Sequence, residues 1–276
     1  MKQIKAIISD ADGTLVNTLY MIRHGQYEAI AEYMIRRGIE RSLIPKYEIY
    51  ESYLNKCVGG DTRATFEKTL KLMFGENHGG LINKIDFDEL DKSLSPIQDR
   101  LAPLYVHPFF GLTEFFTWIG KKGIKFGIYT SGSKRHIVRN FGISLPALGY
   151  EDLFKSDEID SGERMGAFIT RIKAVYGITD MSVTTCEDVV KTKPDPEGLL
   201  KLINEFGVDP DEVVVVGDLP VDMLAAKAGG VRGIGISHGF GSPADLRETG
   251  AICVVESLTS LKKAITAHNL GKKRLF

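Results

Sequence analysis

The chain has 276 residues, 43% of them hydrophobic and 26% charged, which is typical of a folded globular protein and argues against a disordered or fibrous one. Its 35 lysines and arginines nearly balance its 36 aspartates and glutamates, and the formal net charge of −1 disfavours a protein that holds a nucleic-acid backbone. This length permits one large domain or two modest ones, with a core that needs no disulfide or metal for stability.

The three cysteines, Cys57, Cys186 and Cys253, are far apart and show no C-x-x-C spacing. This pattern predicts small buried residues in a reducing compartment, and argues against a disulfide framework or a four-ligand zinc site. No apolar run approaches the roughly 20 residues of a membrane helix. The apolar N-terminal stretch is cut short by Asp10 and Asp12, so we expect no secretory signal. We therefore predict a cytoplasmic protein that binds neither membranes nor nucleic acids.

Six short apolar runs predict strands. The first, residues 4–9, is mostly apolar and β-branched, and an acidic turn that starts at Asp10 ends it. Similar runs follow at residues 124–129, 183–186, 213–216, 231–236 and 252–255, the second of these being the weakest. Amphipathic stretches predict helices at residues 112–122, 136–141, 197–206 and 221–228. Strands that alternate with helices predict an α/β fold with a doubly wound parallel sheet, covered by helices on both faces.

Residues 18–106 depart from this alternation. Apolar residues recur there at helical spacing, without a strand-like run. They include Ile22, Ala29, Ile30, Tyr33, Met34, Phe66, Leu70, Met73, Leu90, Leu94, Ile97, Leu101 and Leu104. We therefore expect an all-helical domain, inserted after the first strand, whose polar residues form a solvated outer face.

Four polar elements each stand where a predicted strand ends. In an open α/β sheet, ligands bind in the crevice outside the carboxyl ends of the strands, so groups from several strands can converge there. In the first element, Asp10 and Asp12 can face the same side of an extended chain, and Gly13 permits the sharp turn that follows. Repulsion between two nearby carboxyl groups makes their pKa values differ. One group can then stay ionised as a nucleophile or metal ligand while the other donates a proton.

The second and third elements supply groups that suit a phosphate. Residues 130–133 (Thr-Ser-Gly-Ser) follow the strand ending at Tyr129 and open a helix, where backbone N–H groups and hydroxyls form a natural cradle. Residues 191–196 contain two prolines that fix the loop and place Lys193 near the start of the next helix.

The fourth element, residues 217–222, follows a run of four valines. That strand delivers Asp218 to its carboxyl end, and Asp222 lies one helical turn beyond. With Asp10, these two carboxylates make a hard-oxygen site suited to Mg²⁺.

Together the four elements resemble the motifs of the haloacid dehalogenase superfamily of phosphotransferases, in particular its phosphoglycolate-phosphatase-like branch. The resemblance covers essentially the whole chain. It implies a Rossmann-like catalytic core of residues 1–17 and 107–276, with residues 18–106 as a helical cap domain.

The resemblance also implies a role for each site residue. Asp10 would attack phosphorus and become an aspartyl phosphate, while Asp12 would protonate the leaving oxygen and later deprotonate water. Thr130 and Lys193 would hold the phosphoryl oxygens, and Ser131 and Gly132 would lend backbone donors. The Mg²⁺ ligands would be Asp10, Asp12 through its carbonyl, and Asp218, with Asp222 in support.

The sequence departs from the pattern of this branch in three places. Asn17 stands where an Asp is frequent, at the expected hinge into the cap, and Leu219 replaces a small hydroxyl residue. Residues 155–182 are longer than the usual connection, and the apolar residues Ile169, Ile172, Val175 and Tyr176 within them predict an extra amphipathic helix. We expect this helix to cover the core, the alternatives being self-association or a border of the active site.

Substrate choice is expected to rest with the cap. Residues 57–63 resemble the turn by which helical caps of this family reach the active site, and Arg63 offers a planar fork for a carboxylate or second phosphate. The alternative, that Arg63 is an exposed residue on a cap helix without a role in substrate binding, has equal weight. A phosphonate hydrolase would need a Schiff-base lysine in the cap, for which Lys56 is a weak candidate.

The leading hypothesis is a Mg²⁺-dependent phosphatase, monomeric or homodimeric, that hydrolyses a small phosphorylated metabolite. The first alternative is a phosphomutase resembling β-phosphoglucomutase, which shares these residues but shields the aspartyl phosphate from water. A non-catalytic phosphometabolite-binding protein is disfavoured because Asp10 and Asp12 are both present. A true dehalogenase is disfavoured because it has no use for Asp12 or Mg²⁺.

Overall fold

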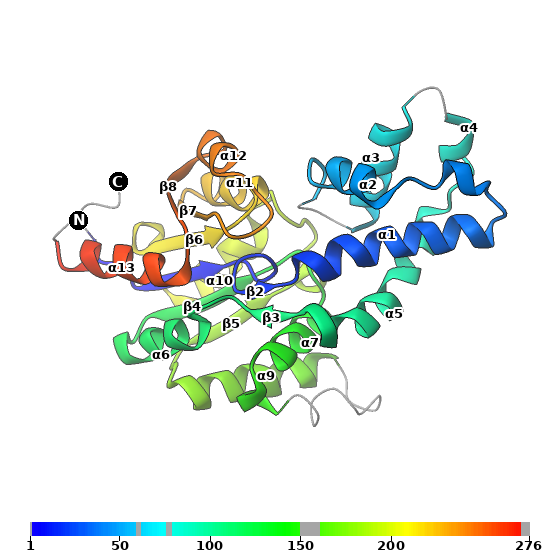
Figure 1. Cartoon of the computed structure of the whole chain (residues 1–276). Helices are drawn as coiled ribbons and strands as arrows, with labels where there is room; N and C mark the ends of the chain where they lie inside the picture. The colour runs from blue at the N-terminus through cyan, green and yellow to red at the C-terminus, as the bar shows by residue number, and fades with distance from the viewer. Residues whose placement is uncertain (1, 59–61, 76–78, 150–160, 272–276) are drawn as a thin grey trace. The chain divides into compact units, whose positions relative to one another are not determined.

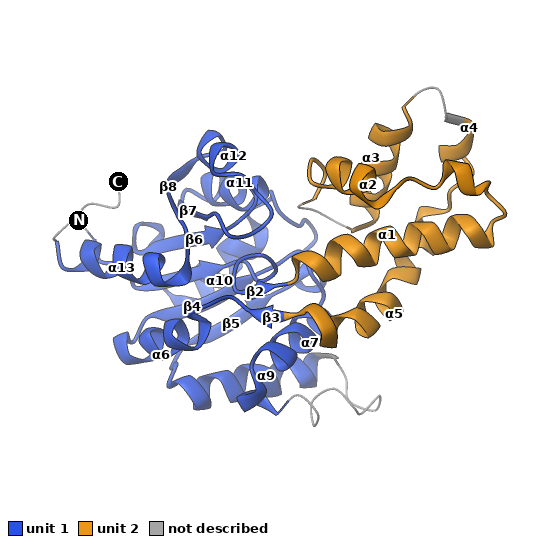
Figure 2. Ribbon diagram, viewed as in Figure 1, with its two compact units in different colours: residues 1–17, 107–276 blue, residues 18–106 orange. Residues whose placement is uncertain are grey.

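The computed structural model describes residues 2–58, 62–75, 79–149 and 161–271. The chain divides into two compact units (Figure 2). One unit consists of residues 1–17 and 107–276, and the other of residues 18–106.

The first unit is built on a six-stranded sheet in the order β5-β4-β1-β6-β7-β8, in which every pairing is parallel (Figure 1). Its strands are β1 (Ala6–Ser9), β4 (Lys125–Tyr129), β5 (Met181–Thr184), β6 (Val213–Gly217), β7 (Arg232–Ile236) and β8 (Ala251–Val255). A separate antiparallel pair joins β2 (Val16–Asn17) to β3 (His107–Pro108). Since β1 lies between β4 and β6, the carboxyl ends of these three strands are neighbours.

Helices cover both faces of this sheet (Figure 1). They are α6 (Leu112–Lys122), α7 (Lys134–Ser144), α9 (Ser161–Tyr176), α10 (Glu197–Phe206), α11 (Pro220–Ala228), α12 (Pro243–Glu248) and α13 (Leu258–Asn269). Short 3₁₀ helices span Pro146–Leu148, Cys186–Asp188 and Pro210–Glu212.

Successive side chains of a strand point to opposite faces of the sheet, so each face carries its own part of the core. On one face, Ile8 of β1 and Val215 of β6 join a buried cluster with Leu199 and Leu202 of α10. The other face carries Phe126 of β4, whose ring lies 5.3 Å from that of Phe116 on α6. The predicted α/β fold, a Rossmann-like doubly wound parallel sheet, is confirmed. The weakest predicted strand lies two residues earlier than expected, because Cys186 already begins a 3₁₀ helix.

The extra helix expected within residues 155–182 is confirmed as α9, and the first residues of that segment lie outside the described ones. Its buried residues Met165, Phe168 and Ile172 recur on one face, and the helix packs against α6 and α7. This helix therefore covers the core, as expected. Val175 does not belong to the buried face, since 46% of it is exposed.

Among its described residues, the second unit contains helices and the segments that connect them, but no strand. Its helices are α1 (Leu19–Arg36), α2 (Tyr47–Leu54), α3 (Thr62–Phe74), α4 (Gly79–Ile82) and α5 (Phe87–Tyr105), with a 3₁₀ helix at Arg41–Leu43. The long helices α1 and α5 pack together. Asp86 caps α5 by accepting from the backbone N–H groups of Asp88 and Glu89, and the Tyr33 hydroxyl accepts from the N–H of Asp86 at 2.8 Å.

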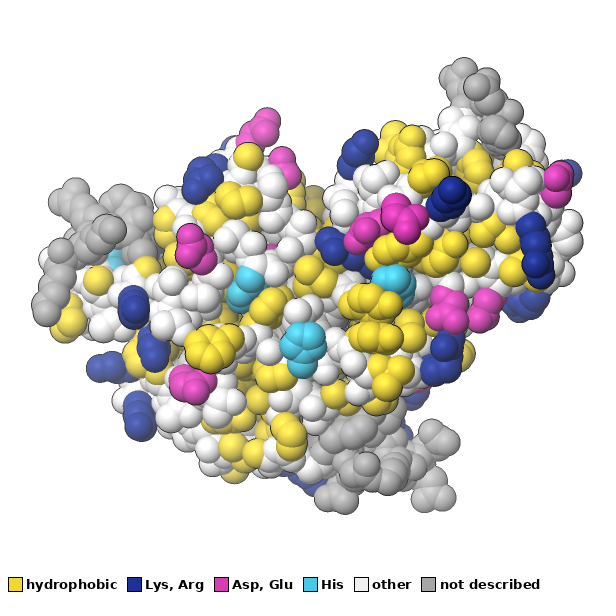
Figure 3. Space-filling model, viewed as in Figure 1, with side chains coloured by type: hydrophobic (Ala, Val, Ile, Leu, Met, Phe, Trp, Pro, Cys, Tyr) yellow, Lys and Arg dark blue, Asp and Glu magenta, His cyan; other side chains and the backbone are white. Residues whose placement is uncertain are grey.

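Three further features of the structure bear on the sequence expectations. All three cysteines are free and partly exposed, so the expectation that they would be buried is wrong. Within the described part of the chain, no helix combines the length and apolar character needed to cross a membrane. On the face shown in Figure 3, lysines and arginines are interspersed with aspartates and glutamates rather than gathered into one patch.

Candidate active site

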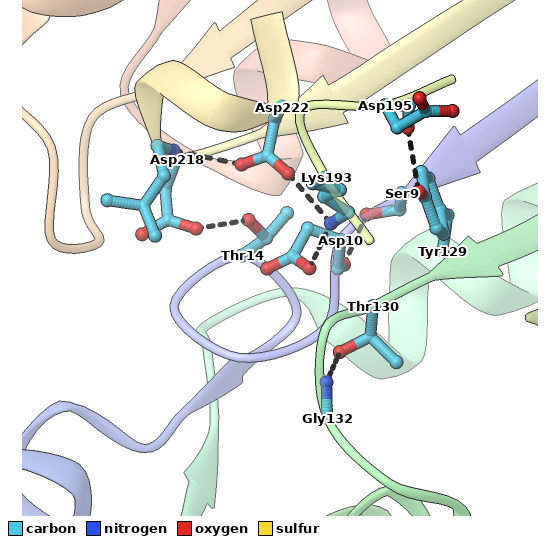
Figure 4. Close-up of polar contacts among 11 residues, drawn as sticks. Ser9, Asp10, Thr14, Tyr129, Thr130, Gly132, Lys193, Asp195, Asp218 and Asp222 are labelled. Carbon is cyan, nitrogen blue, oxygen red and sulfur yellow. Dashed lines mark hydrogen bonds and ion pairs between the residues drawn. The ribbon is translucent and has the colours of Figure 1, made fainter. Parts of the chain in front are cut away.

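The candidate site lies in the first unit, at the carboxyl ends of the central strands (Figure 4). Asp10 follows β1, Thr130 follows β4, and Asp218 follows β6. Lys193 comes from the loop before α10, and Asp222 from the first turn of α11. The parallel order β4-β1-β6 therefore gathers groups that are far apart in the sequence.

Lys193 lies between two carboxylates. Its Nζ donates to Asp10 Oδ1 at 2.6 Å and to Asp222 Oδ1 at 2.7 Å, and all three side chains are buried. Burial alone would lower the pKa of Lys193, but the charges and hydrogen bonds of Asp10 and Asp222 outweigh it and raise that pKa. The lysine is therefore a fixed positive charge.

The phenol ring of Tyr129 lies beside the same ammonium group. Lys193 Nζ is 5.0 Å from the ring centroid, and the Tyr129 hydroxyl donates to the Asp195 carbonyl at 2.9 Å. The ring thus supports the ammonium group while its hydroxyl fixes the loop that carries Lys193. In the sequence, Tyr129 is recognisable only as the end of a strand.

Asp10, Asp218 and Asp222 form a buried acidic cluster. Each offers a carboxylate oxygen, and these three oxygens all lie within 4.8 Å of one another. Burial raises the pKa of Asp10 well above its usual value; the Lys193 charge opposes the rise, while the Asp222 and Asp218 charges add to it. Burial, with the Asp222 charge, raises the pKa of Asp218 to about 7.

This cluster fits a divalent cation. Hard carboxylate oxygens at close range are the ligands that Mg²⁺ prefers. Burial, together with repulsion among the carboxylates, raises the pKa values of Asp10 and Asp218 despite the nearby charge of Lys193. A bound cation would relieve that repulsion.

Asp218 is held on both carboxylate oxygens. Its Oδ1 accepts from the Thr14 hydroxyl at 2.7 Å, and its Oδ2 accepts from the backbone N–H of Phe240 at 2.8 Å. Glycines let the chain pass close to this group: a Cβ at Gly13 would lie 2.4 Å from Asp218 Oδ2, and one at Gly239 would lie 2.1 Å from it. Gly13 also has a φ of +83°, a left-handed conformation that favours glycine.

Asp222 has a second partner besides Lys193. Its Oδ2 accepts from the backbone N–H of Leu219 at 3.0 Å, which caps the start of α11. The Leu219 backbone, rather than a hydroxyl side chain, is therefore what this position contributes to the acidic cluster.

The loop after β4 lies beside Asp12. Thr130 is buried, and its Oγ1 accepts from the backbone N–H of Gly132 at 3.0 Å, which leaves the hydroxyl hydrogen to be donated elsewhere. Ser133 caps α7 by accepting from the N–H of His136. Asp12 Oδ1 accepts from Asn140 Nδ2 at 2.8 Å, although nothing in the sequence pattern singled out Asn140.

Arg63, Lys56 and Asn17 each have contacts of their own. Arg63 belongs to the second unit, where its Nε donates to Asp88 Oδ1 at 2.5 Å and its Nη1 to Glu67 Oε2 at 3.5 Å. Lys56 lies over the ring of Tyr53. Asn17 ends β2, and its Nδ2 is 3.2 Å from His107 Nε2, where the chain passes from one unit to the other. Residues 59–61 of the expected cap turn lie outside the described residues.

The sheet and its acidic site define a Rossmann-like α/β protein with a phosphotransferase-type constellation. Residues 4–230 match the family of haloacid dehalogenase-like hydrolases. The chain therefore belongs to the haloacid dehalogenase-like hydrolases, on the phosphoglycolate-phosphatase-like branch.

Curated relatives and solved structures agree with this assignment. The chain is 25% identical to the phosphoglycolate phosphatase of Rhodospirillum rubrum, over 98% of this chain and 95% of that protein. It is 22% identical to phosphoglycolate phosphatase 1 of Pseudomonas aeruginosa, over 93% and 78% of the two chains. The crystal structure of a hydrolase from Pseudomonas syringae shares the fold, with a TM-score of 0.63, 22% identity, and coverage of 95% and 98%.

Proposed function

We propose that the protein is a Mg²⁺-dependent phosphatase that hydrolyses a small phosphate ester through an aspartyl phosphate on Asp10. The observation that carries this proposal is the contact between Lys193 Nζ and Asp10 Oδ1 at 2.6 Å, beside Asp218 and Asp222. A carboxylate nucleophile fixed by a permanent cation is suited to attack on phosphorus, because phosphoryl transfer depends mainly on positioning and charge neutralisation.

In the first step, a carboxylate oxygen of Asp10 forms a bond to phosphorus while the bond from phosphorus to the ester oxygen breaks. The departing oxygen keeps that electron pair and takes a proton from Asp12. In the second step, Asp12 removes a proton from water, the water oxygen attacks phosphorus, and the Asp10 carboxylate is released together with inorganic phosphate.

Other residues hold the phosphoryl group. Thr130 donates its hydroxyl hydrogen, since its oxygen already accepts from Gly132. Lys193 neutralises phosphoryl oxygens, and the backbone N–H group of Ser131 adds a donor in the loop before α7, whereas the N–H of Gly132 already donates to Thr130 Oγ1. Asp10, Asp218 and Asp222, with the carbonyl of Asp12, would hold Mg²⁺, which when bound supplies charge neutralisation and orientation of the phosphoryl oxygens.

The remaining parts of the proposal concern substrate, assembly and location. We assign residues 1–17 and 107–276 to the catalytic core and residues 18–106 to a cap that sets the substrate, with Arg63 as a contact for an anionic group. The names of the relatives favour phosphoglycolate as the first ester to test. We expect a cytoplasmic monomer or homodimer without affinity for nucleic acid, consistent with the mixed charge seen in Figure 3.

The test is phosphate release from a panel of small phosphate esters, with Mg²⁺ and with a chelator, by the wild type and Asp10→Asn. This substitution keeps the size of the side chain and one acceptor for Lys193 but removes the nucleophile. We expect metal-dependent release that the substitution abolishes. Release that persists in Asp10→Asn would refute the aspartyl phosphate, and isomerisation of a sugar phosphate without free phosphate would favour the mutase.

A further inference from the structure

Asn140, on α7, reaches the carboxyl group of Asp12 from a position 128 residues further along the chain. Its Nδ2 donates to Asp12 Oδ1 at 2.8 Å, and only 1% of Asn140 is exposed. A buried amide in direct contact with a partly exposed carboxyl group has little freedom to move. Asn140 therefore holds Asp12 Oδ1 in place.

The orientation of the Asn140 amide is fixed by its neighbour. Arg139 is almost completely buried, and its Nε donates to Asn140 Oδ1 at 3.0 Å. An arginine nitrogen can only donate, so the amide atom facing it must be the oxygen. The NH₂ group of Asn140 must then face Asp12, and the amide acts on Asp12 as a donor rather than an acceptor.

The other oxygen of Asp12 faces the loop expected to cradle phosphate. An ideal Cβ on Gly132 would lie 3.6 Å from Asp12 Oδ2 and 3.3 Å from Thr130 Oγ1. Oδ2 is therefore on the side of the loop 130–132, while Oδ1 is on the side of α7. The two oxygens of Asp12 thus have different surroundings.

We propose that Asn140 is a positioning residue that orients Asp12 and selects Oδ2 as the atom that carries the catalytic proton. A proton on Oδ2 preserves the hydrogen bond from Asn140 to Oδ1, whereas a proton on Oδ1 would weaken that acceptor. This inference rests on the proposed function, in which Asp12 gives its proton to the departing oxygen.

A neutral donor suits both halves of the reaction. In the first step the proton on Oδ2 passes to the ester oxygen as the bond to phosphorus breaks, and Asp12 becomes a carboxylate. In the second step Asp12 takes a proton back from water. The Asn140 amide can donate to Oδ1 in both states, so the carboxyl group keeps one orientation throughout.

The test compares two esters that differ in their need for a proton. Phosphoglycolate releases an alkoxide oxygen, which must be protonated, whereas p-nitrophenyl phosphate releases a stabilised phenolate that leaves without help. We expect Asn140→Ala to lower kcat/KM for phosphoglycolate, or for the best alkyl phosphate of the panel, by about 10- to 100-fold. The kcat/KM for p-nitrophenyl phosphate should fall less than about threefold, because kcat/KM includes no step after release of the phenolate.

Asn140→Asp is the matched second variant. It keeps an oxygen for Arg139 Nε and nearly the same shape, but it removes the NH₂ donor, so it should show the same selective loss. Val138→Ala, a buried change on the same helix, should lower thermal stability and leave the ratio of the two kcat/KM values unchanged.

Equal losses for the two esters, or no loss, in a folded Asn140 variant would overturn this inference; if one variant does not fold, the other decides. Failure of the proposed function would look different, because the wild type itself would then hydrolyse neither ester.

Discussion

The hydroxyl of Thr14 donates to the carboxylate of Asp218 at 2.7 Å, although the two residues are 204 positions apart. Thr14 closes the loop that begins at Asp10, and Asp218 follows the neighbouring strand β6. The same Asp218 accepts from the backbone N–H of Phe240 in the loop after β7. Three strand-end segments therefore fix the orientation of one buried carboxylate.

Replacing Thr14 with Val should loosen this carboxylate. The substitution preserves shape but leaves Asp218 Oδ1 buried without its donor, which should cost about 1–3 kcal/mol of unfolding free energy. The Mg²⁺ concentration for half-maximal activity should rise about 10- to 100-fold, because residues that hydrogen-bond to a metal ligand, as Thr14 does to Asp218, hold that ligand in its binding orientation. Urea unfolding and Mg²⁺ titration would measure both. Thr117→Val, which removes an exposed hydroxyl on α6, should change neither.

Gly239 gives a steric test of the same carboxylate. A Cβ there would lie 2.1 Å from Asp218 Oδ2, so Gly239→Ala must displace either Asp218 or its loop. We expect a loss of about 1–3 kcal/mol of unfolding free energy and weakened Mg²⁺ binding. Gly166→Ala on α9, where a Cβ meets nothing within 4 Å, should be neutral or slightly stabilising. Equal behaviour of the two alanine variants would refute the close approach at Gly239.

The sequence was sufficient to predict the strand ends that carry Asp10, Thr130 and Asp218. Each follows a short apolar run, and local patterning determines where such runs end. The parallel order of the strands then determines that these residues are neighbours. This part of the site depends on local signals and a general rule of α/β sheets.

The sequence was not sufficient to predict contacts that depend on how separate segments pack. Asn140 reaches Asp12 only because of the rotation of α7 about its axis, which apolar periodicity fixes too coarsely. Phe240 contributes a backbone N–H, a group that every non-proline residue possesses and that leaves no mark in the sequence. The burial of Lys193 between Asp10 and Asp222 likewise follows from the packing of two loops against the first turn of α11, not from its own motif.

Lys193 should be needed for stability as well as for activity. Lys193→Met leaves Asp10 and Asp222 buried without their shared counter-charge, which should cost about 3–5 kcal/mol at neutral pH. The cost should shrink as the pH falls, because protonation removes the uncompensated charge. Chemical denaturation at pH 5 and pH 8 without metal would measure it. Lys191→Met, an exposed change in the same loop, should shift stability by less than about 0.5 kcal/mol.

The acidic cluster should make the metal-free protein less stable as the pH rises. The pKa of Asp218 is about 7 in the folded protein and has its usual value near 4 in the unfolded chain. Between these values the folded state holds more protons on Asp218, so the contribution of Asp218 to the unfolding free energy is greatest below about pH 4 and falls as the pH rises toward 7. The slope from one such group approaches about 1.4 kcal/mol per pH unit, and the raised pKa of Asp10 acts in the same direction.

Asp218→Asn isolates this contribution from the other titrating groups. The asparagine oxygen can still accept from Phe240, and its NH₂ group can donate to the Thr14 hydroxyl, but the side chain no longer titrates. Without metal, the variant should gain stability over the wild type as the pH rises from 5 to 8. Added Mg²⁺ should stabilise the wild type by mass action and the variant far less. Parallel stability curves for the two proteins across this range would show that Asp218 is already ionised in the metal-free fold.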